Sequence, residues 1–323
     1  MQIVKLLLGV AATLVAGVAP GLAAEGYPNR PVRIVVPFAA GGATDIVTRL
    51  VGQKLYDIWG QSVVVDNRAG AGGNIGADMV AKAVPDGYTI LMTSGSIVTA
   101  NPHIYRKMSF DPAKDLLPIS NVASGPQLLG VNASSPWRSI KDLIAAAKAK
   151  PKTITFGSAG FGSQTHLAAE NFIYTAGIDV VHVPYKGEAP ALTDLVGGQV
   201  QFVTSNLPAA IGFVSQGKLR GLGVTSKTRV KQLPDVPTVA ETLPGFENLG
   251  WFGLMAPAGT PRAIVTRIQQ DIAKVLEGAD VRERLEKLGM YATPNSPEEF
   301  AKDIKEESKR WLKIVRERKL VVE

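Results

Sequence analysis

Residues 32–45 decide the fold, and they read VRIVVPFAAGGATD. The first six are mostly β-branched and apolar, which is typical of a strand buried on both faces. Two glycines then allow a tight turn, and apolar residues recur at helical spacing over 44–55. Thr44 or Asp45 is placed to cap this helix. The stretch therefore predicts a buried strand, a short loop and a helix.

The same pattern repeats along the chain. Parallel strands joined by helices follow from such alternation, so we predict an α/β protein whose mainly parallel sheets are flanked by helices. The further segments that we expect are strands at 62–65, 88–92, 153–156, 180–183, 200–204, 219–224 and 251–256, and helices at 74–83, 140–150, 165–176, 189–196, 209–216, 261–277, 280–288 and 297–318.

The order of these segments indicates two domains that the chain crosses between twice. Two short apolar runs over 116–129 are broken at Gly125 and Pro126, which we interpret as the first crossing. The strand at 251–256 is the expected return. Such a double crossing predicts a hinged clamshell with a ligand cleft where the carboxyl ends of the strands face each other. The expected domains are 25–124 with 247–323, and 125–246.

Residues 1–24 have the pattern of a secretory signal peptide. They read MQIVKLLLGVAATLVAGVAPGLAA, with an early Lys5, an apolar middle and small residues at the end. A membrane anchor is the alternative, but the apolar run is short for a span and Pro20 interrupts it. We therefore expect an exported, periplasmic protein from which the leader has been removed.

Composition excludes several kinds of function. The 323 residues include no cysteine, which excludes disulfides, thiolate metal sites and cysteine nucleophiles. The net charge of +7 raises the question of a nucleic-acid partner. Much of the positive charge lies in 302–319, where it alternates with acids as on a solvated helix face. We expect no nucleic-acid partner.

Catalytic and cofactor motifs are missing from the sequence. His103, His166 and His182 lack metal-ligand spacing, and there is neither a G-x-S-x-G nucleophile elbow nor a Walker loop. The glycine loop at 160–165 lacks the third glycine of a dinucleotide-binding fingerprint. We expect no metal, no cofactor and no enzymatic activity. One alternative stays open, an exported enzyme acting on a carboxylate with His166 as its base.

Two glycine-rich loops precede predicted helices, at 37–45 and at 157–166 (GSAGFGSQTH). The N–H groups and partial positive charge at a helix N-terminus bind anions, and hydroxyl side chains add hydrogen bonds. A tight turn is the alternative for each loop, but two such loops in opposing halves favour a shared anion site. The residues that we expect to bind the ligand are Phe38, Ala39, Gly42, Thr44, Ser94, Ser96, Ser158, Ala159, Gly162, Ser163, Gln164, Thr165, His166, Tyr185, Lys186, Ser205 and Asn206.

The order of these motifs resembles one known family over almost the whole chain after the leader. The sequence is similar to the Bug family, also called TctC, the extracytoplasmic solute receptors of tripartite tricarboxylate transporters. The stretches that carry the resemblance are YPNRPVR at 27–33, VPFAAGGATD at 36–45, NRAGAGGNIG at 67–76, PDGY at 85–88, NPH at 101–103, VPYKG at 183–187, LPDVPT at 233–238 and APAGTP at 256–261.

The resemblance implies a two-domain periplasmic-binding-protein fold of the Venus flytrap, type II-like kind. It also implies a monomer that passes a small organic acid to integral membrane transporter subunits. In the family a ligand carboxylate is held by the loops that match 38–44 and 158–166 here. Ser205 stands where the family often has an acid, so the residues lean away from an amino-acid ligand. A receptor that reports to a signalling partner is the remaining alternative.

Overall fold

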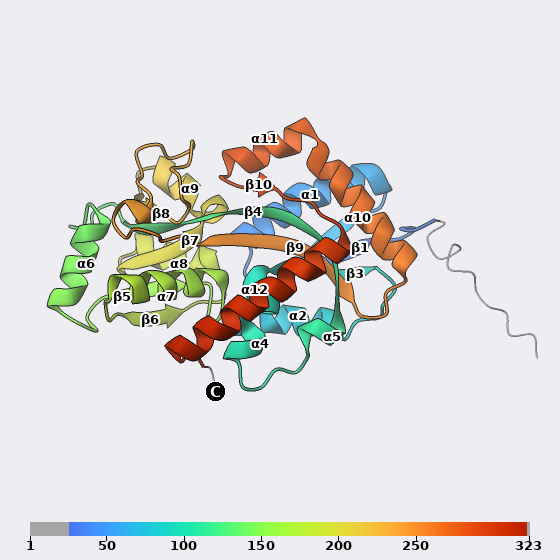
Figure 1. Cartoon of the computed structure of the whole chain (residues 1–323). Coiled ribbons are helices and arrows are strands. Elements are labelled where there is room, and N and C mark those ends of the chain that lie inside the picture. The colour runs from blue at the N-terminus through green and yellow to red at the C-terminus, as the bar shows by residue number, and fades with distance from the viewer. Residues whose placement is uncertain (1–25, 322–323) are drawn as a thin grey trace, which may run out of the picture.

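The structure, a computed structural model, describes residues 26–321, so the predicted leader at 1–24 lies outside the described part of the chain. The molecule consists of two α/β halves, which two long antiparallel strands connect (Figure 1). These connecting strands are β4 (Leu116–Asn132) and β9 (Leu249–Pro257).

The first half contains the elements before β4 and after β9. Its elements are β1 (Val32–Val36), α1 (Ala43–Trp59), β2 (Val63–Asn67), η1 (Ala71–Gly73), α2 (Asn74–Ala81), β3 (Thr89–Ser94), α3 (Gly95–Thr99), α4 (Asn101–Ile104), α5 (Pro112–Asp115), α10 (Arg262–Glu277), α11 (Ala279–Lys287), β10 (Tyr291–Ala292) and α12 (Pro297–Arg318).

The second half contains the elements between β4 and β9. Its elements are α6 (Ile140–Ala149), β5 (Thr155–Ser158), α7 (Gln164–Ala176), β6 (Val181–Pro184), α8 (Glu188–Val196), β7 (Phe202–Asn206), α9 (Leu207–Ser215), β8 (Leu219–Val224) and η2 (Val239–Glu241).

Each half contains a parallel core of three strands, as the alternating pattern predicts. In the first half β1 pairs in parallel with β2 and β3, and in the second half β5 pairs in parallel with β6 and β7. Antiparallel pairs attach these cores to the connecting strands, β3 to β9 and β7 to β4. The loops that follow β1, β3, β5 and β7 therefore lie where the two halves meet.

The first crossing differs from the prediction only in that the strand is continuous: β4 pairs with β9 as far as Pro126 and with β7 from Gln127 onward. The sequence predicts a break at Gly125 and Pro126, but both residues lie inside the continuous strand β4 and pair with Gly250 and Leu249 of β9. Glycine and proline usually interrupt a strand, and here the partner strand maintains the ladder through them. The connection between the halves is therefore a two-stranded ribbon of β4 and β9, from which β4 continues into the second half to pair with β7 and β8.

Apolar packing explains why the predicted segments form. Val47, Val51 and Leu55 of α1 are fully buried in one core with Ile34 of β1. The helix is longer than predicted and ends at Gly60, whose φ of +61° suits a glycine C-cap. Burial of the periodic face thus fixes the helix against the sheet.

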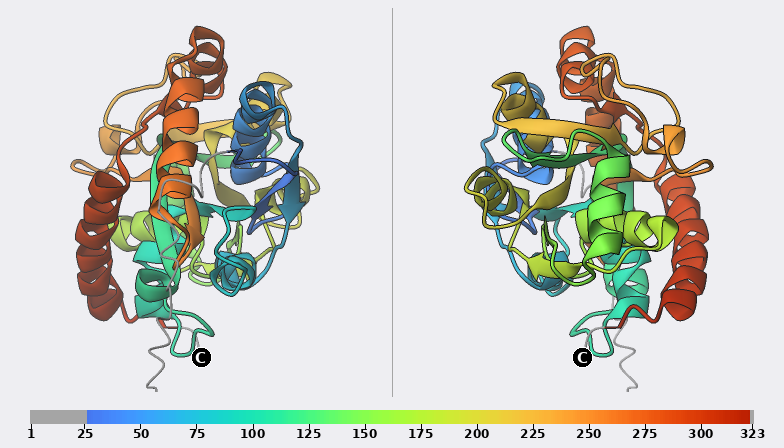
Figure 2. Two further views of the ribbon diagram at one scale, coloured as in Figure 1. Left: turned by 90° about the vertical axis from the view of Figure 1, so that its right-hand side faces the viewer. Right: turned by 90° about the vertical axis from the view of Figure 1, so that its left-hand side faces the viewer.

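Helix α12 adds a third connection between the halves. Its Ser296 forms a capping box with Glu299, as the sequence predicts, and its Phe300 is buried. At its far end, Nη2 of Arg318 donates to Oδ1 of Asn171 on α7, at 2.9 Å. Figure 2 shows α12 and α1 on opposite sides of the molecule, with the sheets between them.

Candidate ligand-binding site

A small cavity lies between the two halves, at the carboxyl ends of the parallel strands. Its volume is about 10 Å³, room for about one water molecule and far below the roughly 300–1,000 Å³ of typical ligand pockets, so side chains almost fill the space between the halves in this structure. Three lining residues come from the first half, one from β9 and six from the second half. They are Phe38, Thr44, Ser94 and Phe252, and Ala159, Ser163, Gln164, Thr165, Glu188 and Asn206.

The N-terminus of α7 presents hydroxyl and amide groups to this cavity. Ser163 is the N-cap, and its Oγ accepts from the backbone N–H of His166 at 3.2 Å. Oγ1 of Thr165 accepts from the N–H of Ala159 at 2.9 Å and lies 3.1 Å from Oγ of Ser163. The first N–H groups of a helix have no partner within the helix. This end of the cavity is therefore suited to a carboxylate.

The N-terminus of α1 is already occupied, by a residue that the sequence analysis missed. Glu188, the first residue of α8, is 5% exposed, and its Oε2 accepts from the N–H of Ala43 at 2.7 Å. Burial raises the pKa of Glu188, while hydrogen bonds from Ala43, Asn206 and Ser205 act in the opposite direction. A side chain of the second half thus caps the first helix of the first half. The sequence analysis expected Thr44 or Asp45 to cap this helix, but the N-cap is Gly42, which has no side-chain bond.

Glu188 also bears on the expectation, drawn from Ser205, that the ligand is not an amino acid. Ser205 does replace the acid at the end of β7, but its Oγ donates to Oε1 of Glu188 at 3.1 Å. The N–H of Asn206 donates to the same oxygen at 2.6 Å. A carboxylate from α8 therefore lies beside Ser205, and the absence of an acid on β7 is no argument against an amino-acid ligand.

Gln164 lines the cavity, but both polar atoms of its side-chain amide bond the backbone of Trp251 on β9. Its Oε1 accepts from the N–H of Trp251 and its Nε2 donates to the carbonyl of Trp251, both at 3.1 Å. Nearby, the N–H of Ala39 donates to the carbonyl of Lys186 at 3.1 Å. The hydroxyl of Tyr105 donates to the carbonyl of Phe161 at 2.8 Å. These contacts hold the two halves together around the cavity.

Several residues that the sequence analysis assigned to the ligand have other partners in this structure. Oη of Tyr185 donates to Asp194 at 2.7 Å, and the side chain of Lys186 is exposed. Oγ of Ser158 lies 2.7 Å from Nε2 of His182. The predicted residues that do not line the cavity are Ala39, Gly42, Ser96, Ser158, Gly162, His166, Tyr185, Lys186 and Ser205.

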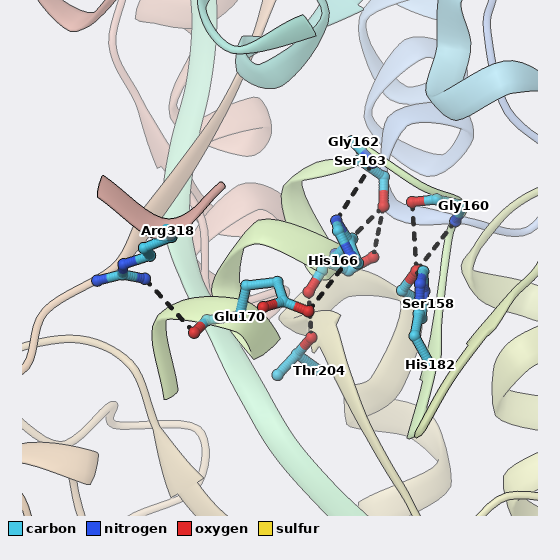
Figure 3. Close-up of polar contacts among 10 residues, drawn as sticks. Ser158, Gly160, Gly162, Ser163, His166, Glu170, His182, Thr204 and Arg318 are labelled. Atoms are coloured by element: carbon cyan, nitrogen blue, oxygen red, sulfur yellow. Dashed lines mark hydrogen bonds and ion pairs between the residues drawn. The ribbon is translucent and has the colours of Figure 1, made fainter. Parts of the chain in front are cut away.

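His166 is buried and does not line the cavity. Figure 3 shows its contacts with the glycine-serine loop and with Glu170. Its Nδ1 accepts from the N–H of Gly162 at 3.2 Å, and its Nε2 lies 3.5 Å from a carboxylate oxygen of Glu170. The ring stacks on His182, with centroids 4.3 Å apart. His166 therefore positions the loop. Within residues 26–321 no three acidic or histidine side chains come together as metal ligands.

The second histidine of this pair gives a pH-dependent prediction. Burial, and then the nearby charge of His166, lower the pKa of His182 to about 3. In the unfolded chain the pKa of this histidine is about 6.5. Below that pH the unfolded state binds a proton at His182, whereas the folded state does not bind one until the pH approaches 3. Stability from this group is complete above about pH 6.5 and is lost as the pH falls. The loss is about 2 kcal/mol at about pH 5.

Urea unfolding of the wild type and His182→Gln at neutral and at acidic pH measures this loss. The wild type is expected to lose about 2 kcal/mol more than the variant on going to about pH 5. The partly buried His103, whose pKa burial also lowers, supplies the control, and His103→Gln should change the acid loss by less. Equal losses in the wild type and His182→Gln would contradict the assignment.

A family model described as the tripartite tricarboxylate transporter family receptor matches residues 47–320. The chain belongs to this family, TctC. The TctC resemblance drawn from the sequence is thereby confirmed, and with it the expectation of a receptor and not an enzyme. Within the described residues, no helix combines the length and the hydropathy that a membrane span requires.

Solved structures of related proteins confirm the fold. The periplasmic binding protein BugD is 34% identical, with a TM-score of 0.88 over 91% of this TctC chain and 99% of BugD. The R. palustris protein Rpa4515, solved with adipate, is 39% identical, with a TM-score of 0.87 over 90% of this chain and 97% of Rpa4515. MatC of Rhodopseudomonas palustris, solved with bound malate, is 33% identical, with a TM-score of 0.85 over 90% of this chain and all of MatC. The protein therefore has the two-domain periplasmic-binding-protein fold.

Proposed function

We propose that the protein is a periplasmic solute receptor that captures a small organic acid between its two halves and delivers it to a membrane transporter. The observation that carries the proposal is the cavity itself, which both halves line and which lies at the N-terminus of α7, with Ser163, Gln164 and Thr165 in its wall. The family to which the chain belongs, and the adipate and malate in Rpa4515 and MatC, support a carboxylate as the ligand.

Domain closure is the proposed mechanism of capture. The domains are 25–124 with 247–323, and 125–246, and they move about the ribbon of β4 and β9. The bonds of Gln164 to Trp251 and of Ala39 to Lys186 surround the cavity, so a ligand requires an open form in order to enter. A ligand that contacts both halves stabilises the closed form because it interacts fully only there. The periplasmic location follows in this proposal from removal of the leader at 1–24.

Thermal unfolding with a panel of acids tests the proposal. The panel contains dicarboxylates, tricarboxylates, hydroxy acids, aromatic acids and amino acids. A true ligand at about 100 times its dissociation constant should stabilise the folded protein by roughly 2.7 kcal/mol. Sodium chloride at equal ionic strength is the control. If no carboxylate shifted the unfolding temperature beyond this salt control, the proposed function would be wrong.

A further inference from the structure

Glu188 is a carboxylate of the protein itself that lies at the boundary between the halves. Its Oε1 accepts from the N–H of Asn206 at 2.6 Å, from Nδ2 of Asn206 at 3.0 Å and from Oγ of Ser205 at 3.1 Å. Its Oε2 accepts from the N–H of Ala43 at 2.7 Å. All four partners donate, which is the environment that a ligand carboxylate would require. Glu188 therefore occupies an anion site that the protein's own donors form.

The α1 end of the cavity is thereby closed to a carboxylate of the ligand. A Cβ added to Gly42, the N-cap of α1, would lie 3.4 Å from Oε2 of Glu188, so the side chain fills the space against the helix. A second carboxylate placed there would lie directly beside a buried acid. Two carboxylates at such short range disfavour each other's charged forms strongly.

The remaining hydrogen-bond acceptor capacity of Glu188 favours a hydrogen-bond donor on the ligand. Oε1 already has three donors, whereas Oε2 has only the N–H of Ala43 among the hydrogen bonds of residues 26–321. An ionised carboxylate oxygen has room for a further donor. A hydroxyl or an ammonium group of the ligand supplies one. The amides and hydroxyls at the start of α7 remain for the single carboxylate of that ligand.

We infer that Glu188 makes this receptor selective for monocarboxylates that carry a hydrogen-bond donor, a hydroxyl or an ammonium group, and excludes dicarboxylates. The inference rests on the proposed function, because it assigns the two ends of the same cavity. It separates this chain from Rpa4515 and MatC, which were solved with the dicarboxylates adipate and malate.

Titration calorimetry with three matched series of acids tests the inference. The series are α,ω-dicarboxylates, ω-hydroxy acids and ω-amino acids of equal chain length. The wild type is expected to bind the best hydroxy or amino acid at least about tenfold more tightly than the dicarboxylate of the same length. Whichever of the hydroxy-acid and amino-acid series binds more tightly identifies the donor as a hydroxyl or an ammonium group. A wild type that bound dicarboxylates as tightly as, or more tightly than, the matched acids would overturn the inference.

Two variants locate the selectivity in Glu188. Glu188→Ala leaves the donors of Ala43, Ser205 and Asn206 without an acceptor, so a second ligand carboxylate can replace the lost one. We expect dicarboxylate affinity to rise at least about tenfold in Glu188→Ala and the preference for donor-bearing acids to disappear. Glu188→Gln removes the charge with little change of volume and should reduce the preference in the same direction.

The control is Glu283→Gln, which removes a charge from the surface of α11, where Glu283 pairs with Lys287. It should leave every affinity unchanged. The wild-type ranking decides the question even where Glu188→Ala does not fold. A protein that bound no acid of any series would contradict the proposed function, whereas one that bound dicarboxylates best would contradict only the role of Glu188.

Discussion

Replacing Gly72 by alanine should weaken ligand binding by about 100-fold while the protein remains folded. Gly72 lies in η1, outside the cavity, and a Cβ on it would overlap the backbone carbonyl oxygen of Phe161 in the opposite half. The same Cβ would lie 3.0 Å from Oη of Tyr105, which bonds that carbonyl. Backbone cannot yield as a flexible side chain does, so the halves must separate.

The size of the effect follows from the population of the closed form. Apparent affinity falls in proportion to the fraction of protein that can bind. A penalty of about 3 kcal/mol on closure therefore corresponds to roughly a hundredfold loss. Isothermal titration with the acid that gives the largest thermal shift measures it.

Gly60 provides a matched control for the backbone strain. Its φ of +61° equals that of Gly72, but a Cβ on Gly60 meets no atom within 4 Å. Gly60→Ala should therefore lose about 1 kcal/mol of stability and retain its affinity. If Gly72→Ala bound the acid as tightly as Gly60→Ala does, closure of the halves would not be needed for binding.

A disulfide between residues 41 and 189 should shut the cavity and prevent ligand entry. A Cβ built on Gly41 lies 3.4 Å from Cβ of Ala189 in the opposite half, close to the roughly 3.5–4.5 Å of natural disulfides. The chain contains no cysteine, so Gly41→Cys with Ala189→Cys introduces its only thiols. The oxidised protein should associate with the acid at least about 100-fold more slowly, because opening precedes entry.

Stopped-flow intrinsic tryptophan fluorescence measures the association rate. One of the four tryptophans, Trp251, bonds Gln164 at the cavity through its backbone. Reduction of the double variant should restore the wild-type rate. Gly41→Cys alone controls for strain at its φ of +82°. An oxidised double variant that associated as fast as its reduced form would show that the ligand enters without separation of the halves.

Local patterns were sufficient to predict most helices and strands. The alternation of β-branched runs with helical spacing placed β1 and α1 correctly, since burial of one face is a property of neighbouring residues. The break in the chain expected at Gly125 and Pro126 is absent, because the strand there pairs with β9, more than a hundred residues later in the chain. Long-range pairing of this kind has no local signal.

The same reason explains what the sequence missed at the site. The loop before α7 was predicted to meet the cavity, and Ser163 and Thr165 do line it. Glu188 looked like an ordinary acid at the start of a helix, where the helix dipole favours it. Only the tertiary structure brings it to Ala43, 145 positions away. The one sequence signal available for Glu188 was its position directly after Gly187, in the loop that follows the strand predicted at 180–183.

The side chains of other predicted residues contact partners that are close in the sequence. His166 is bound by Gly162 and lies near Glu170, each four positions away, and Tyr185 bonds Asp194 on the following helix. A polar residue at a strand end can face the cleft or bond its own helix, and residue type does not distinguish the two.

A crystal structure of the protein with the acid that gives the largest thermal shift tests the central claim most directly. The account predicts the acid in the cavity between the halves, with a carboxylate oxygen within hydrogen-bonding distance of the backbone amides of Gln164 and Thr165. An acid bound elsewhere, for example in the apolar groove between α12 and β4 that Leu116, Met255 and Ile304 line, with the central cavity empty, would contradict it.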